Sequence, residues 1–153
     1  MIGLLQRISN ARVEVSGETI GAIGRGLLVL VGVQRGDGEA QADRLLQRML
    51  GYRVFPDDDG RMNRCLTDIG GGLLLVPQFT LAADTGSGAR PSFTPCADPA
   101  RSKALFDYLC RQAEAQHKPV GCGRFGADMQ VTLTNDGPVT FWLSVPPPAA
   151  DAD

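Results

Sequence analysis

The residue types and spacing in this sequence of 153 residues do not form a standard set for acid–base or nucleophilic catalysis. The chain has one histidine, His117, so a Ser-His-Asp or Cys-His arrangement would have to include it. His117 ends a polar helical segment, where a surface histidine is the ordinary expectation, and no G-x-S-x-G motif accompanies it. The four cysteines show no C-x-x-C spacing, which argues against zinc. We therefore expect no metal and no cofactor.

The acidic run Asp57–Asp59 is the densest group of carboxylates. The alternating D-x-D-x-D-G spacing of a calcium loop is absent, so a solvated turn is the favoured interpretation.

Two other segments contain polar residues that a strand serving only the hydrophobic core would not be expected to have. In VPQFTL (76–81), Gln78 and Thr80 end an apolar run and precede a long loop, so they either line a pocket or face solvent. In TNDGPVT (134–140), Asn-Asp-Gly favours a tight turn with positive φ, which glycine adopts without steric cost. From composition alone the second segment is an ordinary hairpin turn.

Hydrophobic periodicity predicts the elements that hold these segments. A helix is expected from Glu39 to Gly51 with Asp37 as N-cap, and a second after Asp98, with Pro99 at its first position, ending before Pro119. The expected apolar stripes are Ala42, Leu45, Leu46, Met49 and Leu50 in the first helix and Leu105, Tyr108, Leu109 and Ala113 in the second. Strands are expected at 2–8, 11–15, 19–23, 26–33, 52–55, 73–81, 127–134 and 139–145. The sum is one α/β domain over residues 1–145, with largely antiparallel sheets and two helices. The Pro-rich acidic tail, 146–153, is expected to be disordered.

Composition narrows the class of protein. Apolar residues make up 43% and charged residues 21%, and no apolar run approaches the ~18 residues of a membrane span. The first residues lack the pattern of a signal peptide, so we expect a cytoplasmic protein without a membrane partner. The net charge of −2 argues against a protein that coats nucleic acid, because Lys and Arg supply most non-specific affinity. It leaves room for one that holds only a terminal nucleotide.

The two segments, with RVFPDDDGRMN, LAADTGSGARPSF and GRFGADMQVTLTNDGPVTFW around them, closely resemble the D-aminoacyl-tRNA deacylase family over residues 1–145. The resemblance implies that family's fold and a homodimer with pockets at the subunit interface. It implies hydrolysis of the ester that joins a D-amino acid to the terminal adenosine of tRNA, with glycine mischarged on alanine tRNA as a further substrate. It implies no cofactor.

The resemblance also assigns residues. Gly137 and Pro138 correspond to a Gly-cis-Pro dipeptide whose carbonyls reach into the partner's pocket and exclude L-residues, and Arg7 braces it. The substrate pocket would be lined by Pro77, Gln78, Phe79, Phe125 and Met129, with the last three near the adenine. Thr80 is expected to line the pocket as well and is a nucleophile only as a second choice, since the ribose hydroxyl of the substrate can serve instead.

The chain departs from the family at Pro77, where the family pattern usually has serine. Proline removes a hydroxyl and a backbone N–H from the pocket. The N–H groups of Gln78 and Thr80 are expected to remain available. A dimeric nucleic-acid-binding module with weak or no catalysis therefore remains an alternative to the enzyme.

Overall fold

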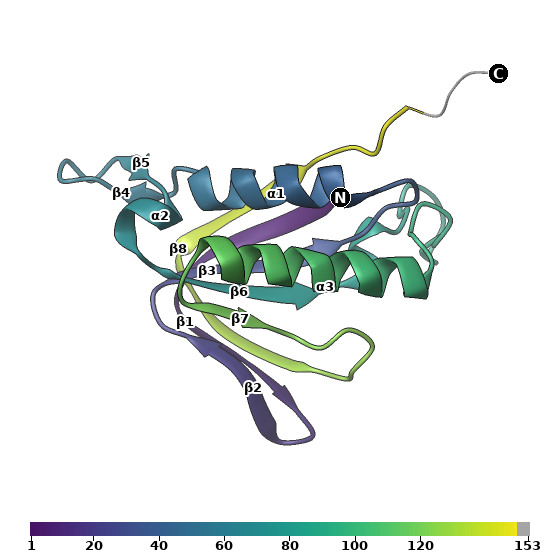
Figure 1. Ribbon diagram of the computed structural model, residues 1–153, viewed down its shortest axis with the longest axis horizontal. Helices are drawn as coiled ribbons and strands as arrows, with labels where there is room; N and C mark the ends of the chain where they lie inside the picture. Colours follow the sequence, from purple (N-terminus) through teal and green to yellow (C-terminus); the bar gives the residue numbers. More distant parts are fainter. Residues whose placement is uncertain (150–153) are drawn as a thin grey trace.

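The computed structural model describes residues 1–149, which form one mixed sheet with two long helices packed on one face (Figure 1). The elements in chain order are β1 (Ile2–Val15), β2 (Glu18–Ile23), β3 (Gly26–Gly32), α1 (Glu39–Gly51), β4 (Phe55–Pro56), β5 (Met62–Arg64), α2 (Leu66–Ile69), β6 (Gly72–Pro77), the 3-10 helix η1 (Phe79–Ala82), α3 (Pro99–Gln116), β7 (Val120–Cys122) and β8 (Gln130–Ser144). The expected α/β class is confirmed. No helix within the described residues is long and apolar enough to cross a membrane.

The sheet has the order β2-β1-β3-β6-β7, and β8 pairs with β1 as well. Strand β1 is antiparallel to β2, β3 and β8, whereas the pairs β3–β6 and β6–β7 are parallel. Antiparallel pairing therefore predominates, as expected. The two small strands β4 and β5 form a separate ribbon.

Strand β1 continues through Ser9 and Asn10, so the predicted break there is wrong. One neighbour changes at that point, from β3, which ends opposite Ile8, to β2, which begins opposite Ala11. Pairing with β8 spans the change and keeps the strand extended.

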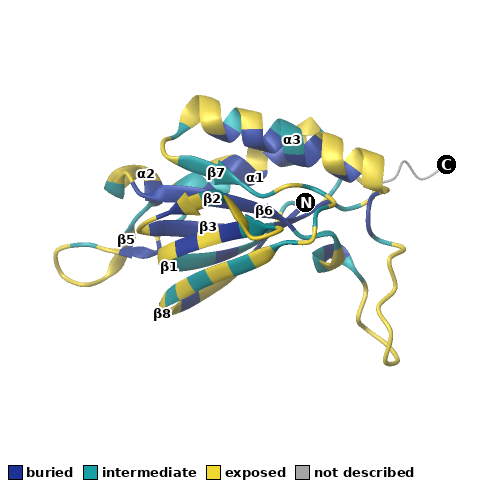
Figure 2. Ribbon diagram, turned by 90° about the horizontal axis from the view of Figure 1, so that it is seen from below, coloured by how far each residue is buried: buried dark blue, intermediate teal, exposed yellow. Residues whose placement is uncertain are grey.

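Both long helices follow the predicted apolar stripes. In α1 the buried residues are Ala42, Leu45, Leu46 and Met49. Figure 2 shows α3 in dark blue on the side toward the sheet and in yellow on its outer side. In α3 the predicted stripe is buried at Leu105, Leu109 and Ala113, while Tyr108 is half-buried. These faces and the covered side of the sheet form the larger hydrophobic core.

The N-cap of α3 is confirmed, because the carboxylate of Asp98 accepts a hydrogen bond from the N–H of Arg101 at 2.8 Å. The predicted N-cap of α1 is wrong, because Gly38 holds that position. Asp37 is instead buried and accepts hydrogen bonds from the α-ammonium group of Met1 at 2.9 Å and from the N–H of Gln34 at 2.7 Å. A buried ammonium group without a counter-charge costs more free energy than a helix end without a side-chain cap, so the Asp37 carboxylate pairs with Met1.

The segment 134–140 is not a hairpin turn, and this prediction is wrong. Strand β8 runs through it, and residues on both sides pair with β1 rather than with each other. Ile8 lies opposite Asn135, but Gln6 lies opposite Thr140, so residues 136–139 bulge out of the ladder. The side chain of Asn135 closes this bulge through the N–H of Val139 and the hydroxyl of Thr140, at 2.9 and 2.8 Å.

Three boundaries also differ from the prediction. The expected strand 52–55 is reduced to Phe55–Pro56, because Tyr52 caps α1 and its carbonyl accepts the N–H of Val54. The expected strand 73–81 stops at Pro77, after which the N–H of Leu81 bonds to the carbonyl of Gln78 and starts η1. Strand β8 begins at Gln130 rather than at residue 127. Residues 146–149 carry no helix or strand, and residues 150–153 lie outside the described residues.

Candidate active site

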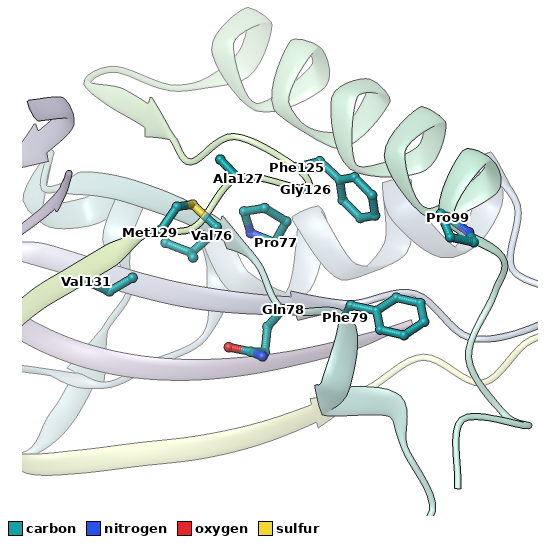
Figure 3. Close-up of a pocket in the computed structure, with 10 residues that line it drawn as sticks. All are labelled: Val76, Pro77, Gln78, Phe79, Pro99, Phe125, Gly126, Ala127, Met129 and Val131. Carbon is teal, nitrogen blue, oxygen red and sulfur yellow. The ribbon is translucent and has the colours of Figure 1, made fainter. Parts of the chain in front are cut away.

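A pocket of ≈ 400 Å³ opens at the end of β6. One wall comes from the end of β6 and the first residues of η1, and the other from the segment that leads into β8 (Figure 3). Five residues assigned by the resemblance line it together: Pro77, Gln78, Phe79, Phe125 and Met129. The sequence places these two groups almost fifty residues apart, and the parallel pair β6–β7 brings them together.

Backbone pairing sets the position of both walls. The N–H of Gln78 donates to the carbonyl of Val31 at 2.8 Å, which extends the β3–β6 ladder by one residue. The N–H of Gly123 donates to the carbonyl of Leu75 at 2.7 Å and fixes the start of the second wall. A Cβ atom on Gly123 would lie 3.0 Å from Pro77 Cδ and 3.0 Å from Met129 Sδ, so the two walls meet at this glycine.

Pro77 is buried and has no N–H to offer to a ligand. The N–H of Gln78 is also unavailable, because Val31 accepts it. We expected this N–H to remain free, and that expectation is wrong. Phe79 and Thr80 occupy the first turn of η1, where backbone N–H groups have no acceptor within the helix.

The pocket holds few polar side chains. The amide nitrogen Nε2 of Gln78 lies 2.6 Å from Thr80 Oγ1 and donates a hydrogen bond to it. Thr80 is exposed at the mouth and is not among the lining residues. The lining residues include no histidine, cysteine, lysine or carboxylate, so the pocket provides no general base beside the Thr80 hydroxyl.

The bulge of β8 lies outside this pocket in the same chain, since neither Gly137 nor Pro138 lines it. Both residues are exposed, the φ angle of Gly137 is +138°, and the peptide bond between them is cis. Arg7 binds the bulge through its side chain: its Nε donates to the carbonyl of Asp136 at 3.0 Å, and its Nη1 donates to the carbonyl of Val54 at 2.7 Å. The structure thus places Arg7 against the dipeptide and leaves the dipeptide free to meet another surface.

His117 lies far from this chemistry. It caps the end of α3, and its Nε2 atom is 2.6 Å from the carbonyl of Gly71. The acidic turn is stabilised by its own residues: hydrogen bonds from the Asn63 amide and the Arg61 N–H lower the pKa of Asp57. A hydrogen bond to the Asp43 carboxylate raises the pKa of Tyr108 to about 12. These groups lie outside the pocket and have structural roles.

Sequence reasoning missed part of the lining: Val76, Pro99, Gly126, Ala127 and Val131. It also missed Phe93, whose ring centroid lies 5.8 Å from that of Phe79. The only signal for Phe93 in the sequence is an aromatic residue in a polar, glycine-rich loop. Position in the chain does not indicate that the loop returns to Phe79.

Comparisons with known proteins identify the family of this chain. Residues 4–144 match the protein family described as D-Tyr-tRNA(Tyr) deacylase. A protein named D-aminoacyl-tRNA deacylase from Thioalkalivibrio sulfidiphilus (strain HL-EbGR7) is 67% identical over 148 residues, which cover 97% of this chain and 99% of that protein. A protein of the same name from Alkalilimnicola ehrlichii (strain ATCC BAA-1101 / DSM 17681 / MLHE-1) is 65% identical, covering 98% of this chain and 100% of that one.

Two solved structures share the fold. One, titled "c-Myc DNA Unwinding Element Binding Protein", superposes with a TM-score of 0.90 at 34% identity and covers 95% of this chain and 99% of its own. The other, titled "Structural Analysis of a probable eukaryotic D-amino acid tRNA deacylase", has a TM-score of 0.75 at 17% identity, covering 94% and 98%, and supports the fold alone. Family match, identity and coverage together place the chain in one group: it belongs to the D-aminoacyl-tRNA deacylase family.

Proposed function

We propose that this chain hydrolyses the ester bond between a D-amino acid and the terminal adenosine of tRNA, and releases the free amino acid and tRNA. The observation that carries this proposal is the pocket at the end of β6, which combines aromatic and thioether surfaces with a small polar rim and no protein acid or base. The close relatives named D-aminoacyl-tRNA deacylase support the same substrate class. We place the activity in residues 1–145 and in the cytoplasm, where charged tRNA is used.

The pocket suits a nucleoside. Its ≈ 400 Å³ falls within the ~300–1,000 Å³ typical of small-ligand sites. Phe79, Phe125 and Met129 offer apolar faces to an adenine, and stacking of a base on an aromatic ring contributes about 1–3 kcal/mol. Such contacts let a chain of net charge −2 hold the end of an RNA without a basic surface.

The reaction needs positioning more than protein nucleophiles. Water attacks the ester carbonyl, the bond from the carbonyl carbon to the ribose oxygen breaks, and the proton from water ends on that oxygen. The N–H groups of Phe79 and Thr80, at the first turn of η1, are the candidates to stabilise the oxyanion. The neighbouring ribose hydroxyl orients the water, so Thr80, which lies next to the lining residue Phe79, is not required as a nucleophile.

Rejection of L-residues is assigned to the bulge of a second copy of the chain. The bulge is exposed at Asp136–Pro138, and no residue of it lines the pocket of its own chain. Strand β8 forms an edge of the sheet within the described residues, and most of it is intermediate or exposed (Figure 2). Its side chains Phe141 and Trp142 are 37% and 54% exposed. An exposed apolar edge is a favourable surface for pairing with another chain.

In this homodimer the carbonyls of Gly137 and Pro138 would face the α-carbon of the substrate. A backbone wall leaves room for hydrogen on that side and none for a side chain. An apolar pocket alone would discriminate by only ~1–3 kcal/mol per methylene.

The substrate proposal is tested with D-tyrosyl-tRNA and L-tyrosyl-tRNA under the same conditions. We expect release of D-tyrosine and no release of L-tyrosine above the spontaneous rate. Equal cleavage of both enantiomers would contradict the wall, and cleavage of neither would contradict the enzyme. Glycyl-tRNA specific for alanine is the further expected substrate, and its kcat/KM relative to D-tyrosyl-tRNA measures how much the side chain contributes.

The dimer is tested by mixing two inactive variants. Gly137→Ala alters the wall, and Met129→Trp fills the pocket. If each site joins the pocket of one chain to the bulge of its partner, remixed chains recover about one quarter of the wild-type activity, because half the dimers carry one intact site of two. No recovery, with dimers demonstrated by sedimentation, would place the complete site within one chain.

A second candidate is a nucleic-acid-binding module without catalysis. The structure titled "c-Myc DNA Unwinding Element Binding Protein" favours it, because that name describes DNA binding on the same fold. The test is binding of uncharged tRNA and of DNA at an enzyme concentration at which D-tyrosyl-tRNA is stable. Tight binding without turnover would support the module over the enzyme.

A further inference from the structure

An exposed aromatic ring lies just outside the pocket, on the loop between η1 and α3. Phe93 is 46% exposed, and its ring is tilted by 34° to that of Phe79 with 5.8 Å between the centroids. Because Phe79 lines the pocket, Phe93 continues the aromatic surface from the pocket to the outside. Folding has left this ring in water although few large apolar side chains in the described part of the chain are so exposed.

The backbone that carries Phe93 is ordered by its own hydrogen bonds. Asp84 and Ser92 exchange two backbone hydrogen bonds of 2.8 Å, which close the loop before Phe93. The carbonyl of Phe93 accepts the N–H of Cys96 at 3.0 Å, and the Sγ atom of Cys96 lies 3.7 Å from the carbonyl of Phe79. The ring is therefore presented from a fixed position. Ordered exposed apolar surface is typical of a binding site.

The same loop carries a cation. Arg90 is exposed and lines a depression formed by residues of this loop, and among the ion pairs of residues 1–149 none includes it. A guanidinium group matches a phosphate through paired hydrogen bonds. Proteins that bind single-stranded nucleic acid combine an aromatic side chain, on which a base stacks, with a positive charge that contacts the backbone. Phe93 and Arg90 supply these two features.

We infer that Phe93 and Arg90 bind the nucleotide that precedes the terminal adenosine of the tRNA. Its base stacks on the exposed face of Phe93, and Arg90 contacts a phosphate next to it. The inference rests on the proposed function, which puts the terminal adenosine beside Phe79. The loop then acts as a second subsite that selects an RNA end over a free aminoacyl nucleoside.

The test compares two substrates for the variant Phe93→Ala: D-tyrosyl-tRNA, and D-tyrosyl-adenosine, which lacks the preceding nucleotide. The loss of one stacked base corresponds to about 5- to 150-fold in affinity. We expect kcat/KM for D-tyrosyl-tRNA to fall within this range and kcat/KM for D-tyrosyl-adenosine to stay within about twofold of wild type.

Further variants separate stacking from folding. Phe93→Tyr keeps the ring and should retain activity on both substrates, whereas Phe93→Leu keeps an apolar contact to Phe79 but should show the selective loss. Arg90→Gln should reduce the slope of log affinity for tRNA against log salt by about 0.7, the value for one contact to a single strand. Arg90→Lys is the matched control and should keep that slope.

An equal loss on both substrates would overturn the inference, because Phe93 would then act only by supporting Phe79. No loss on either substrate for Phe93→Ala and Phe93→Leu would overturn it as well. If wild-type enzyme hydrolyses neither substrate, the proposed function itself fails and takes this inference with it. The wild-type measurement therefore distinguishes a failure of the proposed function from a failure of this inference.

Discussion

Substitution of Gly137 by alanine gives the sharpest test of the bulge. A Cβ atom at this position would lie 2.7 Å from Val139 Cγ2, 3.0 Å from the Val139 backbone nitrogen and 3.2 Å from Arg7 Nη2. Val139 is 9% exposed and β-branched, so its side chain has little freedom to withdraw. The φ angle of +138° adds backbone strain for any L-residue.

The magnitude follows from these contacts. A residue held in a sparsely populated backbone region costs about 1–3 kcal/mol, and the bulge can relieve part of that cost by shifting, because Asp136 to Pro138 are exposed. We therefore expect the free energy of unfolding to fall by about 1–3 kcal/mol. A displacement of the wall by about 1 Å is expected to lower kcat/KM for D-tyrosyl-tRNA by about 100-fold.

Gly17→Ala is the matched control. Gly17 also has a positive φ, +79°, but a Cβ atom there meets nothing within 4 Å, and the residue lies in the β1–β2 turn. This variant should lose stability without losing activity. The assays are urea unfolding and deacylation of D-tyrosyl-tRNA, each on both variants. Wild-type kcat/KM for a folded Gly137→Ala, or the same loss for both variants, would refute the role of the bulge.

Other predictions concern the fold. Asp37→Asn should lower the free energy of unfolding by about 3–5 kcal/mol, because the buried α-ammonium of Met1 loses its counter-charge; urea denaturation measures it, and a change below 1 kcal/mol is the contrary result. Spectrophotometric titration should find Tyr108 ionising at about 12, and Asp43→Asn should bring it back towards the ordinary ~10. Since the folded pKa is raised, the stabilisation from this pair is present below about pH 10 and lost as the pH rises through about 12; unchanged titration in Asp43→Asn would exclude the pair as the cause. Leu74→Ala should cost about 2–5 kcal/mol, because the side chain is fully buried, and thermal unfolding that matches wild type would contradict this.

Much of the fold was predictable from local patterns. The apolar stripe of α1 and the Asp98-Pro99 start of α3 identify the helices, since their periodicity and caps involve residues within a few positions of each other. The buried run of β3 is equally local. The change of pairing partner along β1 is not a local property. No residue near Ser9 indicates that β1 pairs first with β3 and then with β2, while β8 pairs along its other side.

The candidate site divides in the same way. Gln78 and Phe79 stood out because polar and aromatic residues end a buried strand. Only long-range packing brings Pro99 to the pocket and Phe93 to the ring of Phe79. Asp37 has the residue type of an N-cap, but its carboxylate binds the α-ammonium group of Met1, which is 36 residues away in the sequence. Burial of a charged group outweighs the local preference.

The TNDGPVT segment shows most clearly which features depend on residue type and which depend on tertiary structure. The residue types determined by themselves that the backbone must leave the regular ladder there, because Gly137 permits a positive φ and Pro138 lacks an N–H. Tertiary structure alone decided that the departure is a bulge rather than a hairpin, because both flanks of β8 find hydrogen-bond partners on β1 and Arg7 holds the bulge outward. Local chemistry sets which conformations a segment can adopt, and the partners of its hydrogen bonds select one of them.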